Sequence, residues 1–129
     1  MNRRTYLITM AAAGGVSTVA AQPARNPIQL HVDLDVNPAQ ENEMVSNFRK
    51  VFRPTISKQP GFVAVTLLKL RNVMAGDFAK NWNYRLIISF QTEEQRLVWV
   101  KTDDHQRAWP TIEKTLRGNK FKAVLYDIV

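Results

Sequence analysis

The segment 28–36 constrains the fold more than any other feature of this sequence. Apolar and polar residues alternate along its whole length, which is the pattern of a β-strand whose two faces meet different surroundings. Such a strand needs neighbours in a sheet and a hydrophobic layer against one face. The apolar positions are Ile28, Leu30, Val32, Leu34 and Val36.

A helix is predicted directly after this strand. Asn37 is a favourable N-cap, Pro38 suits the first helical position, and Gln40 stands where a capping box has its partner. Pro54 should kink or end the helix, because proline lacks the amide hydrogen that the preceding turn needs. The apolar stripe at helical spacing consists of Met44, Phe48, Val51, Phe52 and Ile56.

Two strands are predicted next, over 62–71 and 84–91. The turn Pro60-Gly61 precedes the first of them, and a polar connection over 72–83 joins the two. The first strand is apolar on both faces along most of its length, so both faces should be buried. Strands joined in this way are expected to be antiparallel neighbours.

A second helical region and a last strand complete the chain. A capping box beginning at Thr92 opens the helical region, which should be interrupted near 102–104 and at Pro110 and should stop at Gly118. The last strand is predicted over 121–128. The order strand, helix, strand, strand, helix, strand predicts an α+β ferredoxin-like fold, βαββαβ, whose four-stranded antiparallel sheet carries both helices on one face.

The other face of such a sheet would be bare. Its apolar candidates would form a larger patch than a soluble monomer normally exposes. We therefore expect a homodimer in which two sheets pack face to face as a dimeric α/β barrel. The candidates are Val63, Val65, Leu67, Ile87, Val124, Tyr126 and Ile128.

Residues 1–21 have the pattern of a secretory leader. A basic start with Arg3 and Arg4 is followed by a weakly apolar stretch and then by small residues. The arginine pair, one free position, an aromatic residue and a leucine resemble a twin-arginine signal. About 15 apolar or small residues are fewer than the roughly 20 that a membrane-spanning helix needs. We expect cleavage after Ala21, no stable membrane anchor, and one domain over 22–129 in the periplasm or outside the cell.

Composition excludes several kinds of site. The chain has no cysteine, which rules out disulfides, thiolate metal sites and a cysteine nucleophile. Beyond the leader, 16 basic residues stand against 11 acidic ones, and the basic residues are scattered rather than clustered. A nucleic-acid partner is therefore not expected.

Two local patterns carry a resemblance to a known family. They are Gln59-Pro60-Gly61-Phe62-Val63, and Phe90-Gln91-Thr92-Glu93-Glu94 followed by Trp99, Asp104-His105-Gln106 and Trp109. With the element order, they resemble the antibiotic biosynthesis monooxygenase family of dimeric α/β barrels over nearly all of 22–129. The resemblance implies oxidation of phenols, quinols or anthrones by molecular oxygen without metal, flavin or other cofactor. The family also includes haem-degrading members.

His105 is the candidate catalytic base. It shares a helical stripe with Trp109, Ile112 and Leu116, which should turn it toward the sheet. Because imidazole titrates near neutral pH, His105 could accept a phenolic proton. The alternative is a structural histidine that caps the helix start after Thr102.

Aromatic residues and a second histidine are the candidates for substrate binding. The aromatic residues would line a flat pocket between helices and sheet, unless they are simply core. Haem-degrading members of the family carry an asparagine on the first strand, where this chain offers His31 or Gln29. The substrate-binding candidates are Trp99, Trp109, Tyr84, Phe48, Phe90 and His31.

No metal site is predicted. His31, Asp33 and Asp35 share one face of a strand, but a strand spreads three such residues over roughly 13 Å, too far to reach one ion. Ion pairs with basic residues on neighbouring strands are expected instead. The expected partners are Lys69, Arg71 and Arg85.

Three functions remain open from the sequence. The first is a cofactor-independent monooxygenase that binds a small aromatic molecule and molecular oxygen. The second is a non-catalytic periplasmic module that binds a hydrophobic small molecule or haem. The third is an assembly scaffold with a filled interior.

Overall fold

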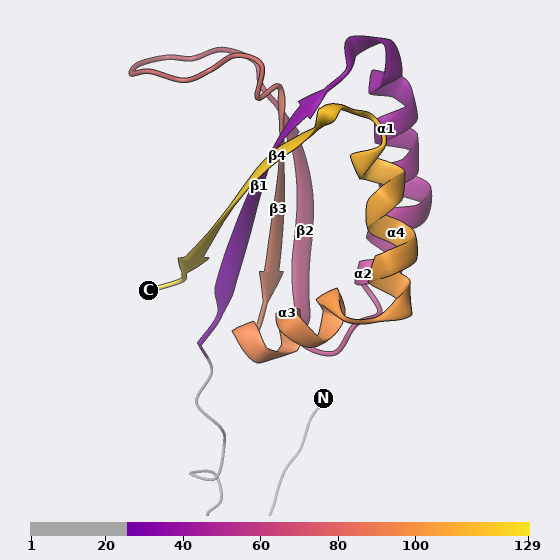
Figure 1. The fold of residues 1–129 in the computed structure, drawn as a ribbon. Coiled ribbons are helices and arrows are strands. Elements are labelled where there is room, and N and C mark those ends of the chain that lie inside the picture. The colour runs from indigo at the N-terminus through magenta and orange to yellow at the C-terminus, as the bar shows by residue number, and fades with distance from the viewer. Residues whose placement is uncertain (1–25) are drawn as a thin grey trace, which may run out of the picture.

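The computed structural model describes residues 26–129, so the predicted leader and its cleavage site lie outside the described residues (Figure 1). The element order agrees with the predicted βαββαβ arrangement. The elements are β1 (Ile28–Val36), the 3-10 turn η2 (Pro38–Gln40), α1 (Glu41–Asn47), the π-helical turn η3 (Phe48–Phe52), α2 (Arg53–Ile56), β2 (Phe62–Lys69), β3 (Tyr84–Phe90), α3 (Glu93–Val100), α4 (Asp103–Glu113) and β4 (Leu116–Asp127).

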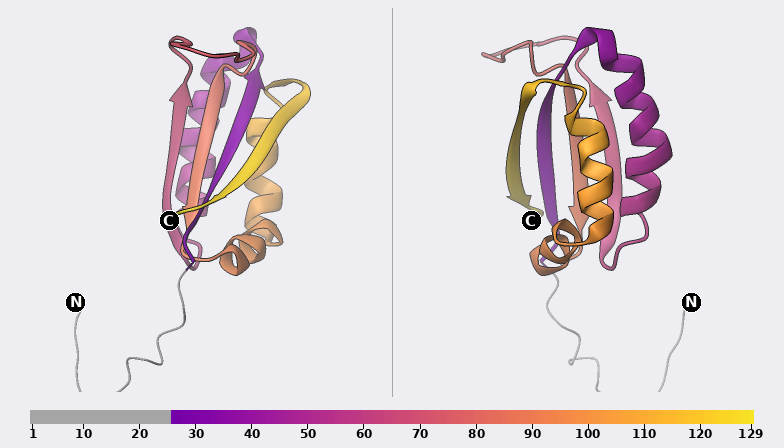
Figure 2. Two further views of the ribbon diagram at one scale, coloured as in Figure 1. Left: turned by 90° about the vertical axis from the view of Figure 1, so that its left-hand side faces the viewer. Right: turned by 45° about the vertical axis from the view of Figure 1, so that its right-hand side comes forward.

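The four strands form one antiparallel sheet in the order β2-β3-β1-β4. In this register His31 on β1 lies between Ile87 on β3 and Val124 on β4. Helices α1, α2 and α4 cover one face of the sheet, and α3 lies across one end of it (Figure 1, Figure 2). The predicted α+β ferredoxin-like fold is confirmed.

The first helical region begins as predicted and continues past its proline. The Asn37 side chain accepts a hydrogen bond from the backbone amide two residues later at 3.0 Å. Before Pro54 the helix widens into η3, where the Arg53 amide donates to the Phe48 carbonyl. Pro54 lies in the first turn of α2, directly after the widened turn, where the spacing of the helical hydrogen bonds changes. The proline therefore does not end the helix.

The second helical region divides where predicted, but it ends earlier. Thr102 caps α4 just after α3 has ended. The expected interruption at Pro110 and end at Gly118 were wrong, because α4 runs through Pro110 and stops at Glu113. Pro110 and Gln106, one turn earlier, are both exposed, so water can solvate the carbonyl that the proline leaves unpaired.

Strand β4 begins earlier than the predicted residue 121. Gly118 and Asn119 lie inside it with left-handed backbone angles, φ +60° and +55°. The pairing with β1 shifts register between Leu34 and Val36 at the same place. Glycine and asparagine tolerate such angles, so they bend the strand here instead of ending a helix.

The hydrophobic core fills the space between sheet and helices. Val65 and Leu67 pack against it, because the register pairs them with Ile88 and Leu86, whose side chains belong to the core. Their predicted place on the bare face was wrong. The core consists of Ile28, Val32, Leu34, Val36, Met44, Phe48, Phe52, Ile56, Tyr84, Leu86, Ile88, Phe90, Trp99, Ala108, Ile112 and Leu116.

We call the uncovered side of the sheet the open face. The register and the alternation of strand side chains place Ile87, Val124 and Tyr126 on it, as predicted, beside charged residues. Its members include Gln29, His31, Asp33, Leu68, Arg85, Ile87, Lys122, Val124 and Tyr126. Within residues 26–129, the helices are all too short or too polar to cross a membrane.

Candidate active site

A cavity of about 240 Å³ lies between the helical layer and the sheet. Aliphatic side chains of the sheet form its floor, and aromatic side chains form much of its wall. Among the described residues that line it, polar side chains come from Arg96 and His105 alone. The lining residues are Leu30, Val32, Phe52, Leu86, Ile88, Arg96, Trp99, Val100, His105, Trp109, Phe121 and Ala123.

The sequence explains both the shape and the apolar lining of this cavity. Trp99 and Trp109 come from different helices and stand edge-on to Phe52, with ring centroids 6.1 and 6.5 Å away. Ala123 pairs with Val32 in the register, and its short side chain leaves space above the sheet. The volume exceeds that of a cavity of about 150 Å³ that accepts benzene. A compound with one or two rings is therefore the size of ligand that it suits.

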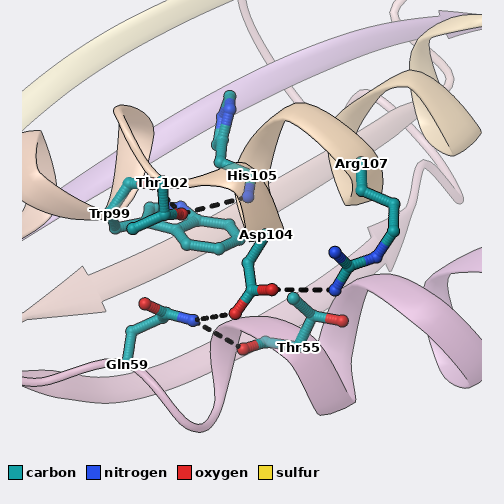
Figure 3. Close-up of polar contacts among 7 residues, drawn as sticks. All are labelled: Thr55, Gln59, Trp99, Thr102, Asp104, His105 and Arg107. Atoms are coloured by element: carbon teal, nitrogen blue, oxygen red, sulfur yellow. Dashed lines mark hydrogen bonds and ion pairs between the residues drawn. The ribbon is translucent and has the colours of Figure 1, made fainter.

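Thr102 fixes His105 relative to Trp99. The Thr102 hydroxyl accepts a hydrogen bond from the His105 backbone amide at 3.1 Å and donates one to the Trp99 carbonyl at 2.7 Å (Figure 3). The Trp99 and His105 rings lie edge to face, with centroids 5.0 Å apart and planes at 80°. One hydroxyl thus joins the end of α3 to the start of α4.

The surroundings of His105 favour the neutral imidazole. Burial lowers the pKa of His105, and the positive charge of Arg96 lowers it further. The His105 Nδ1 atom is buried and has no hydrogen-bond partner among the described residues. The helix start is capped by the Thr102 side chain, whereas the structural alternative gave this role to His105. A neutral imidazole beside an apolar cavity can accept a proton from a ligand.

A second network holds the start of α4 in place. Gln59 Nε2 donates to Asp104 Oδ2 at 3.1 Å and to the Thr55 carbonyl at 3.2 Å. Arg107 donates to the other Asp104 oxygen at 2.8 Å (Figure 3). Hydrogen bonds from Arg107 and Gln59 lower the pKa of Asp104. The network ties the residue before His105 to the chain that follows α2, so it positions the histidine without touching the cavity.

The structure brings three of the predicted site residues together. His105, Trp99 and Trp109 line the cavity. Phe48 belongs to the core and lines a separate groove near Arg49, while Phe90 is fully buried against Phe62. Neither of these two phenylalanines lines the cavity.

Tyr84 and His31 also lie outside the cavity. Tyr84 donates a short hydrogen bond to Glu41, and burial with this contact raises the pKa of Tyr84, so the phenol keeps its proton at neutral pH. His31 lies on the open face, where it contacts Gln29 at 2.7 Å and packs on the Tyr126 ring at 4.7 Å. Burial and Arg85 lower the pKa of His31.

The carboxylates of β1 are paired with basic residues. Arg85 Nε lies 2.8 Å from Asp33, which is the pairing predicted for this strand. Arg117 Nε lies 2.7 Å from Asp35, and Lys69 pairs with Glu41 rather than with β1. The described residues hold no group of three or more side chains suited to a metal ion.

Sequence reasoning missed Arg96 and Phe121 as lining residues. Arg96 precedes Trp99 and Val100 by three and four positions, which places all three on one helical stripe. That spacing was the available signal for Arg96. Phe121 packs edge-on to Trp109, with ring centroids 5.2 Å apart. Only the register of β4 reveals this contact.

No family model matches the sequence, and no curated protein matches it at a significant level. A dimeric ferredoxin-like protein of unknown function from Jannaschia sp. CCS1 superposes with a TM-score of 0.68 and 12% identity, covering 79% of this chain and 99% of that one. The fold is ferredoxin-like.

Two similar ferredoxin-like structures bear the names of oxygenases. A candidate antibiotic biosynthesis monooxygenase from Caulobacter crescentus CB15 gives a TM-score of 0.64 at 18% identity, covering 81% of this chain and 92% of that one. SnoaB, a cofactor-independent oxygenase from Streptomyces nogalater, gives 0.62 at 17% identity, covering 78% and 91%. At these identities the likeness establishes the fold that the chain shares with them.

Proposed function

We propose that this chain is a cofactor-independent monooxygenase of the antibiotic biosynthesis monooxygenase type, acting on a small aromatic compound such as a quinol or anthrone. The observation that carries the proposal is His105, a base kept neutral at the edge of a cavity with aromatic walls. The likeness to structures described as oxygenases supports it.

In the proposed reaction, His105 accepts the proton of a ring hydroxyl. The resulting anion is electron-rich enough to reduce dioxygen, and the ring forms a bond to one oxygen atom. The oxygen–oxygen bond then breaks. The substrate gains one oxygen atom and loses two hydrogen atoms, and the second oxygen leaves as water. All the electrons come from the substrate, and the apolar walls reduce the contact of the anion with bulk water.

Oxygen uptake by chelator-treated protein tests this proposal. Wild type should consume oxygen with a small hydroquinone or anthrone, and His105→Ala and His105→Gln should be slower by roughly a hundredfold or more, the usual contribution of a general base. Lys101→Gln is the control, because Lys101 is exposed and lies outside both the cavity and the open face. Equal rates for wild type and both His105 variants would remove His105 from the mechanism.

We further propose that the chain acts as a homodimer joined through the open face. Leu68 and Tyr126 are 45% and 50% exposed there, and large exposed apolar residues on one face mark an interface. Similar structures from Jannaschia sp. CCS1 and Thermobifida fusca YX are described as dimeric. A periplasmic or secreted location is proposed from the leader pattern alone.

A second candidate function is a binding module for a hydrophobic small molecule. The nearly apolar lining of the cavity favours it, since such a lining retains a ring ligand without any chemistry. The volume suits a small ring compound better than haem, because pockets for drug-sized ligands already occupy roughly 300–1,000 Å³. Ligand retention without oxygen uptake would decide for this function.

A further inference from the structure

Arg96 places a positive charge in the wall of an otherwise apolar cavity. Its side chain is 16% exposed, and it lines the cavity from α3 while His105 lines it from α4. The remaining lining side chains are hydrocarbon or aromatic. A partly desolvated cation in such a wall is stabilised most by an anion bound in the same apolar cavity.

Part of the hydrogen-bonding capacity of Arg96 is left unused by the described residues and can serve such an anion. Its Nε and Nη2 atoms each donate to Glu93 at 2.7 Å, which uses two of the five N–H donors of a guanidinium group. Glu93 is about twice as exposed as Arg96, at 33%, so water screens its charge more strongly. Arg96 and His105 line the same cavity; burial lowers the pKa of His105, and the positive charge of Arg96 lowers it further.

We propose that Arg96 selects ring compounds that carry an anionic oxygen, as a carboxylate or an ionised hydroxyl, and pairs with that oxygen inside the cavity. This inference deepens the proposed function because it gives the substrate an acidic group. Its meaning for catalysis rests on the proposed function. The same pairing stabilises the anion that forms when His105 removes a proton. A neutral hydrocarbon of equal size leaves the guanidinium group desolvated and unpaired, so it binds less tightly.

Two probes of equal shape test the selection. They are 2-naphthoate and the uncharged 2-naphthamide, titrated separately at neutral pH. The readout is fluorescence quenching of Trp99 and Trp109 in a Trp82→Phe background, since Trp82 lies outside the cavity. Wild type should bind the naphthoate at least about tenfold tighter, as expected for one hydrogen bond to a charged group.

Substitutions of Arg96 should change the preference rather than binding in general. Arg96→Gln should abolish the preference for naphthoate over naphthamide and keep naphthamide binding. Arg96→Lys should retain part of the preference for naphthoate. Arg96→Met preserves the length of the stem and gives the same comparison if the glutamine variant does not fold. Lys101→Gln is the matched control, because Lys101 is an exposed cation next to the same helix and outside the cavity.

The outcomes separate this inference from the proposed function. Equal affinity of wild type for the two probes, or a preference for naphthoate that survives Arg96→Gln, would overturn the proposed selection by Arg96. The monooxygenase proposal would be unaffected by either result. A preference lost with Arg96 supports the selection even if oxygen uptake is absent, in which case the monooxygenase proposal fails by itself. Failure of both probes to bind wild type would overturn the cavity as a ring-binding site, and both proposals with it.

Discussion

Thr102→Ala tests how the candidate site is held together. The Thr102 hydroxyl caps α4 through the His105 amide and also bonds the Trp99 carbonyl. Loss of an N-cap costs roughly 0.5–2 kcal/mol, and loss of a neutral hydrogen bond costs roughly 0.5–1.5 kcal/mol. The free energy of unfolding should therefore fall by about 1–3.5 kcal/mol. Urea denaturation followed by circular dichroism measures this change.

Thr92→Ala is the matched control, because Thr92 caps α3 by accepting from the Gln95 amide at 3.2 Å. It should cost roughly 0.5–2 kcal/mol as an N-cap, yet leave His105 in place. Only Thr102→Ala should also slow oxygen uptake, since it releases the proposed base His105 from Trp99. A Thr102→Ala variant as stable as wild type, or a Thr92→Ala variant that slows oxygen uptake equally, would contradict this role of Thr102.

Three further predictions concern pH, the cavity and the open face. The pKa of His105 in the folded chain lies below 6.5, and only the neutral imidazole can accept a proton. Oxygen uptake should therefore increase as pH rises through the pKa of His105. The free energy of unfolding should decrease as pH falls below about 6.5, because the unfolded chain then binds a proton more readily than the folded chain. His105→Gln should reduce this dependence of the unfolding free energy on pH, which urea denaturation at several pH values measures. Ala123→Leu should fill the cavity and weaken naphthamide binding at least about tenfold while the fold is kept, as fluorescence titration and circular dichroism would report. Val124→Asp should dissociate the proposed dimer by burying a charge at its interface, and an unchanged mass in sedimentation velocity would argue against the open face as that interface.

Periodicity and capping were sufficient to predict the element order. The alternation along 28–36 and the caps at Asn37 and Thr92 are local properties of the chain, and the structure confirms all three. The errors arise where the outcome depends on solvent exposure or on pairing between distant strands. Pro110 stays helical because water can reach the unpaired carbonyl, and Gly118 bends a strand because its position is set by pairing with β1.

The faces of β2 could not be assigned from sequence. Apolar residues occupy both faces of this strand, so period-two alternation gives no direction. Only pairing with β3 places Val65 and Leu67 toward the helices. A one-residue change in register would have placed them on the open face.

The candidate site was predictable only in part. His105 and Trp109 are four residues apart on one helix, so a single stripe brings them to the cavity, with Trp99 added from the neighbouring helix. Tyr84, Phe48 and Phe90 are aromatic residues of the same kind, but they lie at other places along the sheet and core. Arg96 was missed because an i,i+3 pair with Glu93 is typical of an exposed helix surface.

Isotope labelling tests the central claim most directly. Chelator-treated wild-type protein would be supplied with a hydroquinone carrying a carboxylate, under dioxygen labelled with oxygen-18, and product and water would be analysed by mass spectrometry. A base-assisted reaction of substrate with dioxygen predicts one labelled atom in the product, one in water, and loss of both in His105→Ala. An oxidised product without the label, formed equally by wild type and variant, would contradict monooxygenation in this cavity.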